Sequence, residues 1–122
     1  MKHPTKHLFR VIGKENPITG SKLLEHIFVV HETEIPNEET VSYIKKRNWI
    51  LTVKFLDELP ELQNTFDSVS REIIDHYKLL IKDSRPIHPI VLDEDGLVLE
   101  GWYRTIAAKE SNTLIGAYIP LN

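Results

Sequence analysis

The chain has 122 residues, of which 41% are hydrophobic and 27% are charged. This composition fits one folded domain with an ordinary core and excludes a disordered or fibrous protein. The absence of cysteine excludes disulfides, thiolate metal sites, iron–sulfur clusters and cysteine nucleophiles. No apolar run has the length of a membrane helix, and no signal-peptide core follows the basic first residues, so we expect a cytoplasmic protein without a membrane partner.

The net charge of −3 is spread unevenly along the chain. Residues 1–48 carry eight Lys/Arg against six Asp/Glu, whereas residues 49–122 carry seven against twelve. A duplex-binding surface needs clustered cations that displace counterions. The only cationic run is Lys45-Lys46-Arg47, which is too short to distinguish a basic patch from a solvated turn. We therefore do not expect this chain to bind duplex DNA without a separate reader.

The first half of the chain has four segments with a local structural signal. Residues 8–12 are apolar and predict a short strand, and residues 13–20, bounded by glycines and broken by a proline, predict a loop. Residues 23–30 end in β-branched side chains and predict a second strand. Residues 37–47 fit either a short helix capped by the asparagine or a strand that turns back through the cationic run. The sequence leaves that choice open.

The second half has stronger signals. Residues 49–56 are rich in β-branched and aromatic side chains and predict a strand. Apolar residues then recur at helical spacing and predict a helix over residues 67–83, with Asp67 or Ser68 as its N-cap.

The C-terminal part predicts two short strands, a helix and a last strand. Residues 89–92 and 97–100 are joined by an acidic turn that ends in glycine, which is a hairpin signal. A helix is predicted over residues 102–111, and a strand over residues 117–119 that ends at Pro120. The predicted class is α+β, a small mixed sheet with helices packed against it.

The junction between the second of these strands and the helix carries the clearest chemical signal. A strand that passes through Gly101 directly into a helix presents free N–H groups and the positive end of the helix dipole, which together bind anions. Arg104 lies in the first turn, where the dipole disfavours a cation unless an anion is near. That anion is either a carboxylate of the chain, Glu100, Asp93 or Asp95, or a bound phosphate held bidentately. Both alternatives stay open.

Residues 89–108, PIVLDEDGLVLEGWYRTIAA, resemble the core signature of the ParB/sulfiredoxin superfamily. That signature is a Pro-Ile strand, an acidic-glycine hairpin, a strand ending in Asp or Glu, and Gly-x-x-Arg leading into an alanine-rich helix. Residues 49–59 resemble the first strand of the family, and residues 67–83 match the helix before the Pro-Ile strand. The likeness covers residues 49–122. Residues 1–48 form an N-terminal extension that we expect to pack on the same domain, and they are the candidate surface for a protein partner.

The resemblance implies an α+β domain that binds a nucleotide through the Gly-x-x-Arg turn. The phosphate-binding residues would be Gly101, Trp102, Tyr103, Arg104 and Thr105. The implied ligand is a nucleoside di- or triphosphate (ATP, ADP or CTP) with Mg²⁺, and the implied reaction class is phosphoryl transfer to a hydroxyl or to water. Trp102 is either a stacking platform for the base or an anchor in the core.

The family also suggests residues outside the turn. Arg71 and Lys78 lie on the polar face of the predicted helix, which borders the nucleotide in the family, and are candidate phosphate contacts. Their alternative role is on a solvated face, where Arg71 pairs with Asp75 one turn later. Glu61 matches the glutamate that serves as base in serine-kinase-like members, and its alternative role is that of a surface acid. No metal-ligand spacing is present.

The sequence departs from the best-known members. Sulfiredoxin chemistry needs a cysteine in the turn, where this chain has Trp102 and Tyr103. Most relatives have His or Arg immediately before the arginine of the turn, and Tyr103 carries no charge there. DNA clamps carry a helix-turn-helix reader after this domain, and none is expected here. The alternative function is a non-catalytic adaptor or inhibitor of a phage or mobile element, and a ParB-like DNA nuclease ranks third because the second half is acidic.

Overall fold

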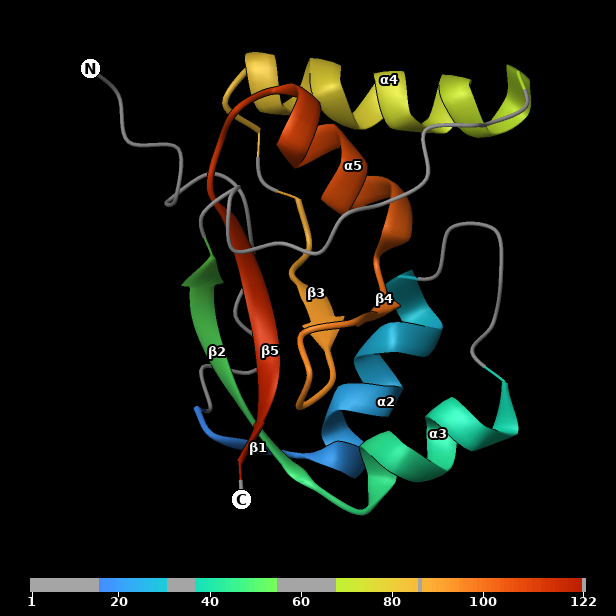
Figure 1. Cartoon of the computed structure of the whole chain (residues 1–122), viewed down its shortest axis with the longest axis vertical. Coiled ribbons are helices and arrows are strands. Elements are labelled where there is room, and N and C mark those ends of the chain that lie inside the picture. The colour runs from blue at the N-terminus through green and yellow to red at the C-terminus, as the bar shows by residue number, and fades with distance from the viewer. Residues whose placement is uncertain (1–15, 31–36, 55–67, 86, 122) are drawn as a thin grey trace.

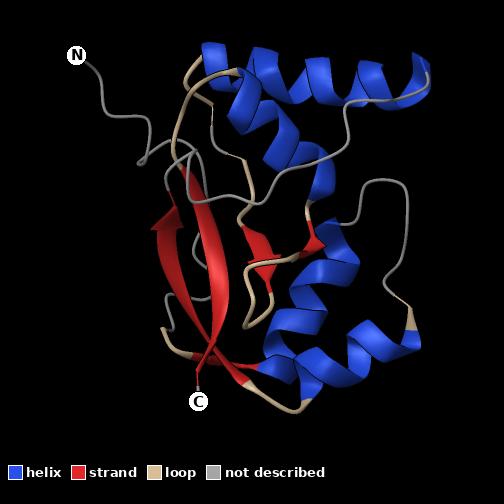
Figure 2. Ribbon diagram, viewed as in Figure 1, coloured by secondary structure: helices blue, strands red, loops and turns tan. Residues whose placement is uncertain are grey.

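The computed structural model describes residues 16–30, 37–54, 68–85 and 87–121. The strands of these segments form a single mixed sheet in the order β1-β2-β5-β3-β4 (Figures 1 and 2). The elements in chain order are β1 (Ile18–Thr19), α2 (Gly20–Val30), α3 (Glu38–Lys45), β2 (Asn48–Lys54), α4 (Ser68–Lys82), β3 (Ile90–Leu92), β4 (Val98–Glu100), α5 (Trp102–Glu110) and β5 (Ile115–Leu121).

Strand β5 lies between β2 and β3 and joins an antiparallel ladder to a parallel one. It pairs antiparallel with β2 from Asn48↔Leu121 to Lys54↔Ile115. On its other side it runs parallel to β3, which in turn pairs antiparallel with β4. A parallel pair needs a crossover connection, and here β4 and α5 supply it between β3 and β5. The predicted α+β class with a small mixed sheet is confirmed.

The sheet is covered by helices on both faces. Because side chains alternate along a strand, Ile90 and Leu92 point to one face and Val91 to the other. Ile90 and Leu92 pack in a buried cluster with side chains of α4 and α5, and Val91 packs in a second buried cluster with side chains of α2 and α3. In Figure 1, α4 lies across α5 at the top of the view, with α2 and α3 at the lower right. The sheet therefore forms the middle of three layers.

Residues of the N-terminal extension contribute to the second cluster. Its buried members are Ile18, Leu23, Leu24, Ile27, Ile44, Trp49, Val91 and Tyr118. Trp49 is fully buried there and donates its indole N–H to the carbonyl oxygen of Ile44 at 3.0 Å. The described part of the extension thus shares a hydrophobic core with the C-terminal part of the chain.

The strand predicted over residues 23–30 is wrong, because this segment belongs to helix α2. Leu23, Leu24 and Ile27 are buried while Lys22 and Glu25 are exposed, which is the spacing of a helix face. Packing of this face overrides the β-propensity of the two valines at the end of the segment. The Thr19 hydroxyl also accepts a hydrogen bond from the Lys22 backbone N–H at 3.2 Å and caps the helix start.

Two other segments differ from the sequence-based prediction, and the structure decides one alternative that the sequence left open. Ile18 and Thr19, expected in a loop, pair with β2. Of the helix and the strand that residues 37–47 allowed, the helix is correct: it is α3, and Asn37 Oδ1 accepts the Thr40 N–H at 2.8 Å at its start. The last strand does not end at Pro120 but continues through it. Strand β5 pairs with β3 at Ala117 and Tyr118. Pro120, which has no N–H to donate, lies beyond these pairs and does not interrupt them.

The remaining predicted elements agree with the structure. The helix expected over residues 67–83 is α4, the hairpin strands are β3 and β4, and the helix after Gly101 is α5. The strand expected over residues 49–56 is β2 as far as Lys54. The strand predicted for residues 8–12 lies outside the described residues.

Candidate functional site

The turn between β4 and α5 is built around Gly101. This residue is the N-cap of α5 in a left-handed conformation, φ 97° and ψ 32°, and no side chain caps the helix. A Cβ atom at this position would lie 2.6 Å from Cγ2 of the fully buried Ile90 and 2.8 Å from a guanidinium nitrogen of Arg104. Both the backbone conformation and the lack of space therefore require glycine here.

The first turn of α5 presents backbone donors and an aromatic side chain. N–H groups in the first turn of a helix have no partner within the helix. The first intrahelical bond starts at Thr105, whose N–H and hydroxyl both donate to the Gly101 carbonyl at 2.9 Å. The Trp102 side chain is 40% exposed, so of the two roles open for Trp102, anchoring in the core is wrong. This end of the helix combines first-turn backbone N–H groups with a partly exposed indole.

Arg104 points into the protein. Only 1% of the residue is exposed. Its terminal nitrogen donates to the Pro89 carbonyl oxygen at 3.2 Å and lies 3.7 Å from a carboxylate oxygen of Glu100, whose side chain is 11% exposed. Of the three carboxylates that the sequence offered as partners, Glu100 forms the ion pair with Arg104. The arginine therefore joins the entrance of β3 to the end of β4 and holds the turn around Gly101.

Tyr103 connects α5 to α4. Its hydroxyl lies 3.1 Å from the hydroxyl of Ser70, at hydrogen-bond distance. The aromatic ring packs at the edge of a cluster formed by Ile74, Ile106 and Ala107 between the two helices. The side chain of Tyr103 thus contributes to the packing of α4 on α5.

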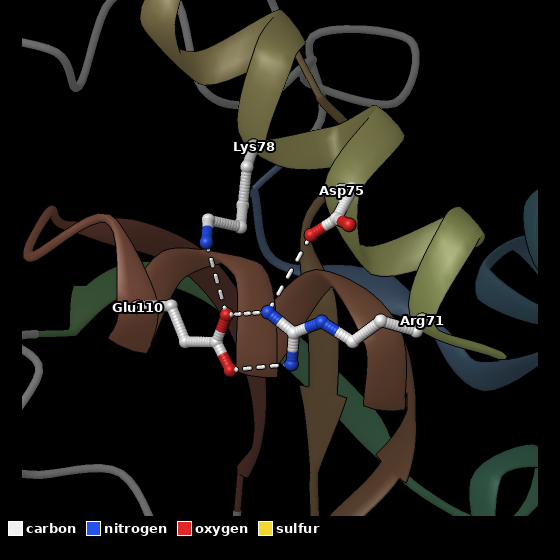
Figure 3. A network of polar contacts seen from close by, with 4 residues as sticks. All are labelled: Arg71, Asp75, Lys78 and Glu110. Carbon is white, nitrogen blue, oxygen red and sulfur yellow. Dashed lines mark hydrogen bonds and ion pairs between the residues drawn. The ribbon is translucent and has the colours of Figure 1, made fainter. Parts of the chain in front are cut away.

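Arg71 and Lys78 converge on Glu110 at the other end of α5 (Figure 3). Arg71 binds Glu110 bidentately, with one of the two hydrogen bonds at 2.9 Å, and Lys78 donates to Glu110 at 3.1 Å. Arg71 also lies 3.4 Å from Asp75, the pair that the sequence offered as the alternative. The hydrogen bond from Arg71 lowers the pKa of Glu110 below its ordinary value of 4.5, and the hydrogen bond to Glu110 raises the pKa of Arg71.

The structure separates the predicted phosphate contacts into two groups. Glu110 is the last residue of α5 and Trp102 the first, so the two lie about 12 Å apart along the helix axis at 1.5 Å per residue. The Gly101–Thr105 turn belongs to the N-terminal end, and the side chains of Arg71 and Lys78 reach the C-terminal end. Glu61 lies outside the described residues. Within the described segments, no group of three or more potential ligands is arranged for a metal ion.

Sequence reasoning missed Ser70, Glu110 and the contact between His26 and His88. The contacts of Ser70 with Tyr103 and of Glu110 with Arg71 join helices α4 and α5, whose relative orientation no local pattern specifies. The sequence contained one indication of these contacts, because Tyr103 and Glu110, seven residues apart, lie on the same face of the predicted helix.

No protein-family model, curated protein or solved structure matches this chain. Among the described residues, no helix is both long enough and apolar enough to span a membrane.

Proposed function

We propose that this chain is a ParB-like nucleotide-binding protein whose phosphate-binding element is the N-terminus of α5. The observation that carries the proposal is Gly101, a left-handed N-cap that follows a strand directly and begins a helix without a side-chain cap. Backbone N–H groups arranged in this way bind phosphate because the donors and the helix dipole act together.

Three residues of the turn have defined roles in this proposal. The backbone N–H groups of Trp102 and Tyr103 donate to phosphate oxygens. The exposed indole of Trp102 stacks on the base, an interaction that tolerates different bases. Arg104 is a positioning residue, because its contacts with Pro89 and Glu100 hold the turn from inside the protein. Mg²⁺ enters with the nucleotide and is held mainly by phosphate oxygens.

The order of elements supports the proposed family. A strand, a helix, a hairpin and a glycine turn into a second helix follow one another as β2, α4, β3, β4 and α5, and β5 returns to the sheet. This is the order that the ParB/sulfiredoxin resemblance implies for residues 49–122. A nucleotide ligand and the lack of cysteine are both in keeping with the cytoplasm.

The test is calorimetric titration of the chain with ATP, ADP, CTP and GTP, each with and without Mg²⁺. Trp102→Asp is the decisive variant: an acid in the first turn suits the helix dipole but repels phosphate, so binding is lost without loss of folding. Leu79→Glu, on an exposed position of α4, adds the same charge elsewhere and keeps affinity. Binding by no nucleotide, or equal affinity in both variants, contradicts the proposal.

A second candidate function is a non-catalytic adaptor or inhibitor module, as found in phages and mobile elements. It is favoured by the pairing of Arg71 and Lys78 with Glu110, and of Arg104 with Glu100, which leaves these cations occupied by carboxylates of the chain. Phosphate release from bound nucleotide distinguishes the two. If the chain is an enzyme, Glu61→Gln keeps nucleotide affinity and lowers turnover, whereas the adaptor shows no turnover in either form.

A further inference from the structure

Two histidines from distant parts of the chain meet between α2 and the segment that enters β3. His26 Nε2 lies 3.2 Å from His88 Nδ1, and the ring centroids are 5.0 Å apart with the planes inclined at 62°. Both residues are half-buried. The two rings therefore approach each other through nitrogen atoms at a site that solvent reaches.

We propose that His26 and His88 bind a divalent transition metal of the zinc class. Imidazole nitrogens bind zinc at about 2.0–2.1 Å, so two of them at a tetrahedral centre are about 3.3 Å apart. The 3.2 Å between His26 Nε2 and His88 Nδ1 matches that spacing. Two imidazoles select zinc, cobalt, nickel or copper over Mg²⁺ and Ca²⁺, which prefer oxygen ligands. Water or an added ligand completes the coordination.

A proton competes with the metal for the same nitrogens. In the metal-free state one ring donates a hydrogen bond to the other, since 3.2 Å is also within hydrogen-bond distance. Metal binding replaces this proton, and affinity falls as imidazole is protonated. This linkage makes metal affinity measurably dependent on pH.

The metal would tie the N-terminal helix to the core of the sheet. His26 belongs to α2, and His88 directly precedes Pro89, whose carbonyl oxygen accepts the hydrogen bond from Arg104. An ion held by both histidines closes a loop of the chain between α2 and β3. Binding to the folded state alone therefore raises the melting temperature. The site uses none of the proposed nucleotide contacts, so the two proposals stand or fall separately.

The test is a titration with Co²⁺ and Zn²⁺ at about pH 7.5, where free imidazole is neutral. All proteins carry His3→Ala and His7→Ala so that the tail histidines do not contribute. We expect one ion per chain, visible-region cobalt absorption and a higher melting temperature with Zn²⁺. His26→Gln and His88→Asn retain hydrogen-bonding groups near the same positions, which preserves folding, and each lowers affinity at least about tenfold.

His76 supplies the matched control, because it is exposed on α4. His76→Gln keeps full affinity if the proposal holds. Absence of saturable binding in the parent protein overturns it. So does binding that survives both His26→Gln and His88→Asn, since the ion would then be held elsewhere. The pH dependence of folding by circular dichroism verifies that each variant is folded at the pH of the titration.

Discussion

Replacing Arg104 with alanine tests whether this residue holds the fold or binds a ligand. The residue is 1% exposed and is paired with Glu100 and with the Pro89 carbonyl. Truncation leaves the Glu100 carboxylate, itself 11% exposed, without this partner and opens a cavity beside the sheet. Breaking a buried ion pair in this way destabilises proteins by about 3–5 kcal/mol. We therefore expect Arg104→Ala to lower the free energy of unfolding by about that amount.

The assay is thermal and urea unfolding followed by circular dichroism. For a domain of this size 1 kcal/mol corresponds to roughly 3–5 °C, so the expected fall in melting temperature is about 9–25 °C. Lys82→Ala, which removes an exposed cation at the end of α4, is the control and changes stability by less than about 0.5 kcal/mol. Arg104→Met restores part of the packing. Adding Glu100→Gln removes the carboxylate charge that the arginine had neutralised, so the double variant is more stable than Arg104→Met alone.

The opposite result would refute this reasoning. If Arg104→Ala melts within about 2 °C of the parent protein and loses nucleotide binding, the guanidinium contacts the ligand and does not support the turn. If Arg104→Ala loses both stability and nucleotide binding, the Arg104→Met/Glu100→Gln variant distinguishes the two roles of the arginine. We expect this double variant to bind nucleotide once its folding is restored.

Two further predictions concern the ends of α5. Gly101→Ala is expected to destabilise the fold by about 2–5 kcal/mol in urea unfolding, because it combines a strained left-handed backbone with a contact of 2.6 Å to the buried Ile90; an unchanged midpoint would contradict this geometry. At the other end, the pKa of Glu110 is lowered in the folded chain, so the unfolded chain binds a proton at this carboxylate more readily. The ionised Glu110 therefore stabilises the fold above the ordinary pKa of 4.5, and this stabilisation is lost as the pH falls through the folded pKa. Melting temperatures of Glu110→Gln and the parent protein should differ at neutral pH and converge once the pH falls below the lowered folded pKa of Glu110. A difference that persists in stronger acid would contradict the assignment.

The sequence alone was sufficient for the elements whose signals are local. Helix α4 follows from apolar spacing, the β3–β4 hairpin from its acidic turn ending in glycine, and the start of α5 from Gly101. Each of these signals acts over a few residues, so no knowledge of the rest of the fold is needed. The phosphate site proposed at Gly101 stays a prediction, since the left-handed conformation and the close contact with Ile90 already require glycine there.

Tertiary structure decided the features that depend on packing partners. Residues 23–30 became a helix because their buried face packs in the cluster around Trp49, against the propensity of their valines. Arg71 and Lys78 turned to Glu110 because the crossing of α4 over α5 determines which of their charges meet. Arg104 turned inward because its partners, Glu100 and the Pro89 carbonyl, lie at the ends of the two neighbouring strands. His26 and His88 are 62 positions apart along the chain. Only the folded sheet brings them together, since no spacing in a sequence encodes a contact between segments that distant.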